Sequence, residues 1–468
     1  MRLAKEHIIN GEKNKSVPRA GGLPLIGQSL QARNNPLGLL TQLVGQHADM
    51  VTVRLGLKDF CLVQSPQAAR HILQENARNY YKPGAARLMK KVLGNGLATS
   101  NGELWLHQRR LMQPAFHKQH LTYFFHLIGH EVSHLAAKWK TENDGATVNI
   151  TKSFLHLTLN NICKAMFGAG IENQTAEIEG LLGTMLTHSS KNLKALLKMP
   201  LWMPTPGNLR FKKAEARFEN ILYRVIDQRK KNGNVSQRND LLQMLLAATE
   251  NNGGGGMSAQ QLRDEITTIF LAGHETTAQT LSWVFYHLAL NQNIQGKVRQ
   301  EVSSVEWNGI GPECLQSFTY TRAVIEEALR IYPPVWIMAR KAAANDCVAG
   351  FSVPAGTTLL INVYGMHHHP SHWVAPGDFQ PERWLNGTKE NLPSYLYLPF
   401  GGGPRLCIGH HFAMMVMQTV VAKLVQAFHF TLPVGAAPIV DANLTLRAKE
   451  GIHLHIHQNQ KHAKEYHT

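Results

Sequence analysis

One cysteine, Cys407, lies between a glycine-rich turn and a long apolar run, and this arrangement constrains the chain more than any other feature. The turn comprises residues 400–406, and the run from His410 to Phe428 has the pattern of a buried helix. Glycines let the backbone turn tightly and let a flat ligand approach without a Cβ in the way. Unpaired N–H groups and the positive end of the helix dipole stabilise a thiolate at a helix start. The stretch therefore predicts a thiolate that binds a ligand.

A haem iron requires this arrangement of an axial thiolate, and the stretch resembles a known signature. Residues Phe400 to Gly409 match the cysteine-ligand motif of the cytochrome P-450 superfamily, Phe-x-x-Gly-x-Arg-x-Cys-x-Gly, at every fixed position. A buried, inert cysteine beside a glycine turn is the alternative for an isolated cysteine. The complete motif favours the haem ligand.

Composition places the chain among large globular proteins. It has 468 residues, of which 44% are hydrophobic and 17% are charged, so a large core is expected. The five cysteines are widely spaced and form no Cys-x-x-Cys pair, which argues against a disulfide framework and a zinc site. We expect a reducing compartment.

The formal charge of +16 permits nucleic acid, an anionic membrane surface or an acidic protein as a partner. No nucleic-acid-binding module is recognisable, and the basic residues are spread out. The segment Met1–Pro18 is polar and has no apolar stretch that could anchor the chain in a membrane. We therefore expect a soluble, cytoplasmic protein with a polar segment at 1–17, one catalytic domain at 18–457 and a histidine-rich tail at 458–468.

A second motif lies inside a long predicted helix that Ser258 caps and that runs through Leu290. Its middle, Ala272-Gly273-His274-Glu275-Thr276-Thr277, resembles the oxygen-activating motif of the same superfamily. A threonine hydroxyl can bond back to the preceding turn and open a groove. Glu275 beside Thr276 supplies an acid–alcohol pair for proton delivery. Glycine at 273 costs helix stability, so we expect close approach of haem or dioxygen there.

Further landmarks follow the superfamily's order. Trp105 and Arg109 are four residues apart, hence on one helical face, and both can donate to a haem propionate. Glu327 and Arg330 form a Glu-x-x-Arg pair, which in the family locks onto an arginine from a later loop, here Arg383. We interpret these three residues as structural.

Shorter elements are also predicted. Val51–Leu55 and Phe60–Val63 alternate as a two-stranded piece, and a helix capped by Ser65 follows. Residues 444–446 and 452–456 have the pattern of a terminal hairpin.

The resemblance covers most of the chain and implies the P-450 fold: mainly α-helical, a triangular prism around haem b with a smaller β-rich subdomain. It implies Cys407 as the iron ligand, and Thr276 and Glu275 in proton delivery during oxygen activation. The implied haem neighbours are Trp105, Arg109, Arg405, Phe400, Gly401, Gly409, Ala272 and Arg340. The candidate pocket residues are apolar or small: Leu97, Ala272, Thr276, Val335, Trp336 and Ile337.

The implied function is a monooxygenase that uses O2 to hydroxylate or epoxidise an apolar substrate, a fatty acid or a terpenoid- or steroid-like molecule. Long-chain fatty-acid hydroxylases show the greatest resemblance. A monomer is expected, with electrons from NAD(P)H through a ferredoxin or flavodoxin and its reductase, because too few residues follow Cys407 for a flavin domain. An acidic donor would suit the basic residues Arg87, Lys90, Lys91, Arg110 and Lys118. A peroxide-driven hydroxylase and a non-catalytic haem-thiolate sensor are the alternatives.

Overall fold

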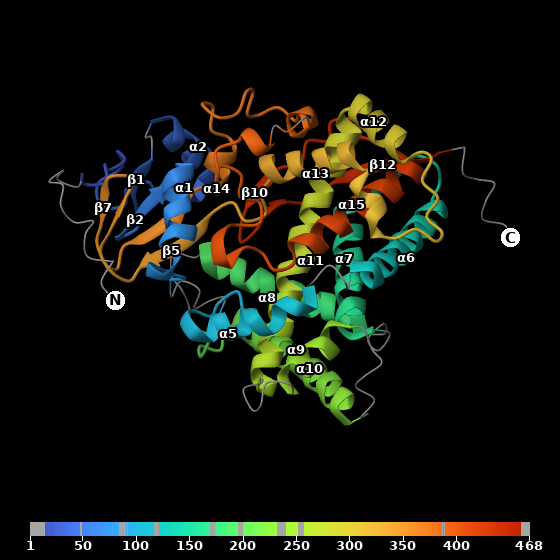
Figure 1. The fold of residues 1–468 in the computed structure, drawn as a ribbon, viewed down its shortest axis with the longest axis horizontal. Coiled ribbons are helices and arrows are strands. Elements are labelled where there is room, and N and C mark those ends of the chain that lie inside the picture. Colours follow the sequence, from blue (N-terminus) through green and yellow to red (C-terminus); the bar gives the residue numbers. More distant parts are fainter. Residues whose placement is uncertain are drawn as a thin grey trace.

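The computed structural model describes residues 15–46, 49–83, 90, 92–116, 121–168, 174–194, 200–231, 240–250, 257–385, 387 and 389–459. In the view of Figure 1, β1 (Met50–Leu55), β2 (Lys58–Val63), β5 (Met338–Ala342) and β7 (Phe351–Val353) gather at the left, β12 (His453–Gln458) lies at the right among helices, and helices fill most of the rest. The outline narrows toward α9 (Pro206–Lys231) and α10 (Leu241–Glu250). The predicted fold class, mainly helical with a smaller β-rich part, is confirmed. Among the basic residues predicted to face a donor, Arg87, Lys91 and Lys118 lie outside the described ranges.

The largest sheet has the strand order β1-β2-β8-β5-β3. β1 (Met50–Leu55) and β2 (Lys58–Val63) pair as the predicted antiparallel hairpin. β8 (Thr358–Ile361) runs parallel to β2, while β5 (Met338–Ala342) and β3 (Tyr80–Tyr81) continue the sheet in antiparallel pairs. The sheet thus ties the N-terminal strands to the segment that follows the Glu-x-x-Arg helix.

Helices form the rest of the framework. The other α-helices are α1 (Ser29–Asn34), α2 (Pro36–Gln46), α3 (Pro66–Arg70), α5 (Gly102–Met112), α6 (Leu121–Lys140), α7 (Ile150–Phe167), α8 (Thr175–Lys194), α11 (Ala259–Leu290), α12 (Gln292–Val302), α13 (Thr319–Ile331), α14 (Val363–His367) and α15 (His410–Ala427). Short 3-10 turns are η2 (Ala77–Asn79), η4 (Gln113–Phe116), η9 (Pro312–Gln316), η10 (Pro381–Trp384), η11 (Lys389–Asn391) and η12 (Gly403–Arg405). Within the described part of the chain, no helix combines the length and the apolarity needed to cross a lipid bilayer.

α11 passes through the centre of the helical core. Ser258 caps it as predicted, because its side chain accepts the N–H of Gln261 and the Gln261 side chain accepts the N–H of Ser258. α7 packs along α11, and the Thr158 hydroxyl donates to the carbonyl of His274 at 3.0 Å. A Cβ on Gly273 would lie 2.9 Å from Cδ1 of Ile162 on α7. Glycine at 273 therefore lets a neighbouring helix approach closely, and the expected approach of haem or dioxygen stays a prediction.

The C-terminal strands differ from the prediction. β12 (His453–Gln458) lies between β4 (Ala146–Asn149) and β9 (Phe428–Thr431), whereas β10 (Val440–Ala442) pairs with β11 (Leu446–Ala448). The predicted hairpin between 444–446 and 452–456 is therefore wrong. β12 gains two partner strands and buries Leu454 and Ile456, which a local hairpin could not provide. A separate pair joins β6 (Asp346–Val348) to β7 (Phe351–Val353).

Candidate functional site

The turn before α15 positions the cysteine. The N–H of Cys407 donates to the carbonyl of Phe400 at 2.9 Å and closes the glycine-rich turn. Gly403 has φ of +63°, and a Cβ there would lie 1.8 Å from the carbonyl oxygen of Leu73. Leu73 belongs to a π-helix, η1 (His71–Glu75), which continues the helix that Ser65 caps. Glycine is required at 403 because this backbone packs directly against it.

The Cys407 side chain is accessible, although protein surrounds its thiol. Burial raises the pKa of this thiol, while the N–H of Gly409, which donates to the sulfur, and the nearby Arg109 lower it. Both observations hold for a side chain that faces a recess inside the protein. The N–H group and the guanidinium favour the thiolate, which is the form that binds a metal.

A cluster of positive charge lies beside this turn; we call Lys82, Arg340 and Arg405 the cation cluster. Burial lowers the pKa of Lys82 to about 7, with Arg405 and Arg340 lowering it further. Burial also lowers the pKa of Arg340 to about 10 and that of Arg405 to about 10. Their hydrogen bonds within the described residues go to uncharged oxygens, those of Ala98, Ala339, Ser100 and Asn101. The charges therefore have no acidic counterpart there.

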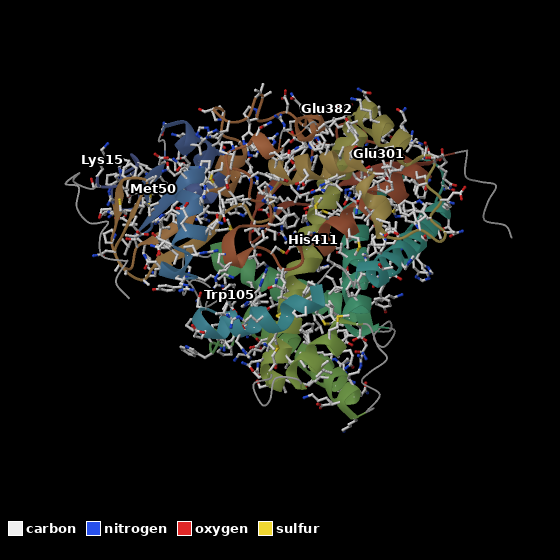
Figure 2. All side chains as sticks on the ribbon, viewed as in Figure 1. Lys15, Met50, Trp105, Glu301, Glu382 and His411 are labelled. Atoms are coloured by element: carbon white, nitrogen blue, oxygen red, sulfur yellow. The ribbon has the colours of Figure 1, made fainter. Side chains whose placement is uncertain are left out.

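Trp105 and Arg109 project from α5 toward the same turn. The Arg405 guanidinium lies over the Trp105 ring, 4.2 Å from its centroid. Arg109 donates to the carbonyl of Leu406 at 2.9 Å, and burial lowers its pKa. Trp105 lies lower in the view of Figure 2 than His411, which is at the start of α15. The two predicted residues thus reach the Cys407 turn from a helix far away in sequence.

One face of α11 carries the acid–alcohol pair. Ala272 is exposed in the middle of this otherwise buried helix, and the Thr276 hydroxyl donates to its carbonyl at 2.6 Å. Thr445 donates to the Glu275 carboxylate at 2.8 Å. Burial raises the pKa of Glu275, against the effect of that hydrogen bond and of Arg447. Glu275 therefore holds a proton more readily than an exposed carboxyl does.

Glu327, Arg330 and Arg383 form what we call the buried ion network. Arg330 donates twice to the Glu327 carboxylate, at 2.9 and 2.8 Å, and Arg383 donates at 2.9 Å. Trp384 donates to the same carboxylate at 2.8 Å. Arg330 also donates to three backbone carbonyls, those of His367, Pro376 and Asp378. The network fixes the loop that leads toward Cys407.

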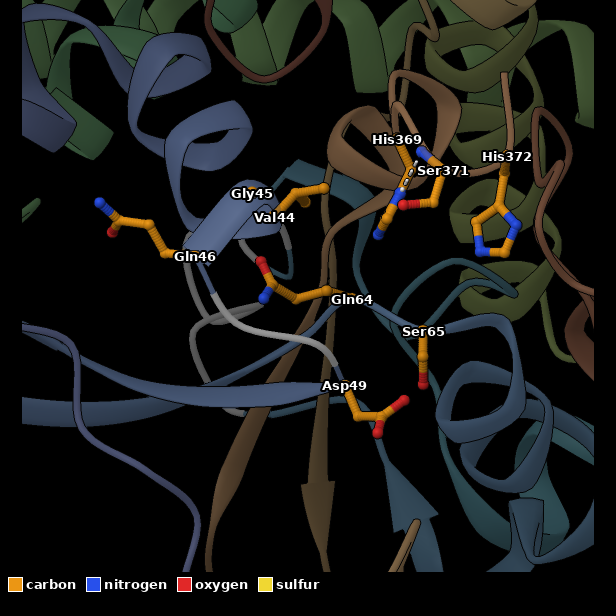
Figure 3. A pocket seen from close by; sticks show the side chains of 9 residues that line it. All are labelled: Val44, Gly45, Gln46, Asp49, Gln64, Ser65, His369, Ser371 and His372. Atoms are coloured by element: carbon orange, nitrogen blue, oxygen red, sulfur yellow. Dashed lines mark hydrogen bonds between the residues drawn. The ribbon is translucent and has the colours of Figure 1, made fainter. Parts of the chain in front are cut away.

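A recess of about 390 Å³ lies between the end of α2 and the segment after α14 (Figure 3). The N–H of Ser371 donates to Nδ1 of His369 at 3.1 Å across one wall. Polar side chains dominate its lining: Asp49, Gln64, Ser65, His369, Ser371 and His372. It contains none of the predicted pocket residues, and its polarity does not suit an apolar substrate.

Comparison with known proteins identifies the family. The family model described as Cytochrome P450 matches residues 17–455. The chain belongs to this family. Cyclooctat-9-en-7-ol 5-monooxygenase from Streptomyces melanosporofaciens is 33% identical over 86% of this chain and 87% of the relative. The chloroplastic protein LUTEIN DEFICIENT 5 from Arabidopsis thaliana is 30% identical, over 95% of this chain and 77% of that protein.

Other matches extend this picture. Pentalenene oxygenase from Streptomyces avermitilis is 28% identical over 88% of this chain and 90% of that enzyme. A solved structure described as the cytochrome P450DA heme domain superposes with a TM-score of 0.85. It covers 96% of this chain and 99% of its own, at 21% identity, and therefore supports the fold alone. As a cytochrome P450, the protein is a monooxygenase, and the family implies haem and O2.

The residues present fit a haem group. Cys407 is an exposed residue on a glycine-rich turn, and the cation cluster beside it has no acidic partner in the described residues. Buried cations are costly unless an anion pairs with them. Two carboxylates such as haem propionates would supply that charge.

The predicted pocket residues are less uniform in their surroundings. Leu97 is buried and Val335 is exposed. Trp336 and Ile337 pack against the small core of β1 and α2, and Trp336 donates to the carbonyl of Asn443 at 2.9 Å. The assignment of the pocket remains a prediction, and for Trp336 and Ile337 these contacts supply a structural role.

Sequence reasoning missed Lys82 and the backbone groups of Ser100 and Leu73. Lys82 has no motif around it, and its neighbours Arg340 and Arg405 are distant in sequence. The tyrosine pair before Lys82 forms the edge strand β3, which pairs with β5, the strand that contains Arg340. A prediction of this strand pairing could have placed Lys82 near Arg340.

Proposed function

We propose that this cytochrome P450 is a haem-thiolate enzyme that hydroxylates or epoxidises a terpenoid-like substrate with one oxygen atom of O2. The observation that carries the proposal is the exposed residue Cys407 on its glycine turn, next to a cation cluster that has no acidic partner among the described residues. Haem b with an anionic sulfur ligand would supply dioxygen binding and O–O cleavage. Cys407 would hold the iron, and Lys82, Arg109, Arg340 and Arg405 would hold the propionates.

Thr276 and Glu275 would manage protons on the substrate side. The Thr276 hydroxyl lies on the exposed face of α11 with Ala272, and the raised pKa of Glu275 means that this carboxyl holds a proton more readily than an exposed one does. Thr276→Ala should leave the haem spectrum and the substrate-induced shift intact but lower the product formed per reductant consumed, with peroxide released instead. Unchanged coupling in this variant would contradict the role of Thr276.

The relatives favour terpenoids over fatty acids as substrates. Two of the matched enzymes are named for cyclooctat-9-en-7-ol and pentalenene, which are terpenoids. The test is a spectral screen of cyclic terpenes, terpene alcohols, steroids and fatty acids, followed by turnover of each hit under ¹⁸O2. We expect terpenoid hits and one labelled oxygen atom per product molecule. Shifts with fatty acids alone would overturn the substrate class, and unlabelled product would overturn the chemistry.

Electrons would come from NAD(P)H through a ferredoxin or flavodoxin with its reductase, in the cytoplasm, with the enzyme as a monomer. Lys90 and Arg110, the two described residues of the predicted basic group, are exposed. An acidic donor would be attracted to them. Turnover should therefore fall as ionic strength rises, and turnover that is independent of salt would argue against an acidic donor.

A further inference from the structure

The segment Gly94–Leu97 lies against α11 through two hydrogen bonds from its backbone to carboxylates. The N–H of Asn95 donates to Asp264 at 2.8 Å, and the N–H of Leu97 donates to Glu265 at 2.9 Å. A Cβ on Gly96 would lie 2.2 Å from the hydroxyl of Thr268. The backbone of this segment therefore contacts α11 more closely than a residue with a side chain would permit.

The residues that directly follow this segment, up to Ser100, reach the candidate haem site. Gln108 on α5 donates to the carbonyl of Asn95 at 2.8 Å. Lys82 donates to the carbonyl of Ala98, and Arg405 donates to that of Ser100 at 3.2 Å. Residues 94–100 thus connect α11 to the cation cluster.

Glu265 is placed to act on the substrate side. It precedes Ala272 by seven residues and Thr276 by eleven, so all three lie on one face of α11. Its side chain is 0% exposed, and its oxygen Oε1 has no hydrogen-bond partner among the described residues. Buried oxygens of this kind are rare in folded proteins, so a role beyond packing is expected.

We propose that Asp264 and Glu265 form a carboxylate clamp on Gly94–Leu97, and that release of this clamp admits substrate to the α11 face that carries Ala272 and Thr276. The substrate step rests on the proposed function. Glu265 acts here as a positioning residue, because it touches the backbone of Leu97 and acts on the substrate through it.

The charge on Glu265 sets the strength of the clamp. Burial raises the pKa of Glu265 to about 7, with Asp264 raising it further and the N–H of Leu97 lowering it. In the released state the carboxyl would meet water and regain a pKa near 4.5. Protons therefore favour the closed clamp, and ionisation favours release. A shift from 4.5 to about 7 predicts that the released population rises about tenfold between pH 6 and pH 8.

The other charged groups at this end of α11 are accounted for. Asp264 accepts from Arg263 at 2.8 Å, and Arg263 also pairs with Glu219 on α9. Lys82 lies at the far end of the segment, at Ala98. No described cation pairs with Glu265, so its titration depends on burial and on Asp264.

Two substitutions separate the clamp from simple packing. Glu265→Gln keeps an acceptor for Leu97 and stays neutral, so it should close the clamp at every pH. Glu265→Met removes the acceptor and should release it. The readout is hydrogen exchange of a peptide spanning 92–101 in the haem-loaded protein at pH 6 and pH 8, corrected for the intrinsic rate. Glu301→Gln is the matched control, because Glu301 accepts the backbone N–H groups of Tyr320 and Thr321 elsewhere in the fold.

We expect corrected exchange in the wild type to rise about tenfold from pH 6 to pH 8. It should be slow and independent of pH in Glu265→Gln, fast in Glu265→Met, and unchanged in Glu301→Gln. The rate at which 4-phenylimidazole shifts the Soret band should follow the same order. If both Glu265 variants exchange faster than the wild type, or neither differs from it, the clamp is overturned. If exchange follows the prediction but the Soret band does not respond to the azole, the haem function fails while the clamp stands.

Discussion

Two clusters of buried charge in this molecule differ in whether their cations share an acidic partner. In the buried ion network, Glu327 and Arg330 are both 0% exposed. The guanidinium of Arg330 donates to the Glu327 carboxylate and to backbone carbonyl oxygens. In the cation cluster, Lys82, Arg340 and Arg405 have no acidic partner among the described residues, and burial lowers the pKa of each. Cations that share a buried carboxylate support the fold without a ligand. Buried cations without an acidic partner among the described residues would favour a bound anion.

The largest expected effect comes from unbalancing the network. Glu327→Gln leaves Arg330 and Arg383 without their shared carboxylate, and the loss of one partner of a buried ion pair costs about 3–5 kcal/mol. Denaturant unfolding followed by circular dichroism should show this loss. Glu177→Gln is the control, because Glu177 pairs with Arg217 on the surface, where such pairs contribute about 0–1 kcal/mol. If the two substitutions lower the free energy of unfolding equally, the buried ion network does not stabilise the fold more than a surface ion pair does.

Arg340→Met tests whether the cation cluster binds haem or stabilises the fold. Because no acid among the described residues pairs with Arg340, the substitution leaves none of their carboxylates without a partner, and the fold should persist with an unchanged circular dichroism spectrum. Haem should leave the protein about tenfold faster or more, because a hydrogen bond to a charged group contributes about 1.5–3 kcal/mol. Transfer of haem to an excess of apomyoglobin measures that rate. If Arg340→Met lowers the stability of the fold but leaves the rate of haem transfer unchanged, Arg340 stabilises the fold and does not bind haem.

The smallest effect concerns Lys82 and pH. Without an anion, burial lowers the pKa of Lys82 to about 7. A bound propionate would raise that pKa, so haem binding is favoured by the protonated lysine and weakens as pH rises above 7. Haem transfer should therefore accelerate severalfold between pH 7 and pH 9. In Lys82→Met this dependence should disappear, and its persistence would show that another group titrates.

Local sequence signals predicted the parts of the structure that depend on neighbouring residues. The Phe400–Gly409 motif, the β1–β2 hairpin and the Ser258 cap each need contacts only a few residues apart. They also sufficed to predict the family and the fold class, which the comparisons confirm.

The failures involve partners far apart in the chain. β12 pairs with β4, some three hundred residues earlier, so a local pattern suggested the wrong hairpin. The contact of Gly273 with Ile162 on α7 and the position of Lys82 near Arg340 and Arg405 were likewise not predicted. None of these contacts leaves a periodic signal, because each depends on how separate elements pack.

The most direct test of the account is the spectrum of the purified, reduced, carbon-monoxide-bound protein. Thiolate ligation by Cys407 predicts the strongly red-shifted Soret band of the family. Cys407→Ala should lose that band, whereas Cys347→Ala, which alters another exposed cysteine, should keep it. A Soret band at the position typical of histidine ligation, or a red-shifted band that survives in Cys407→Ala, would contradict the assignment of Cys407 as the iron ligand.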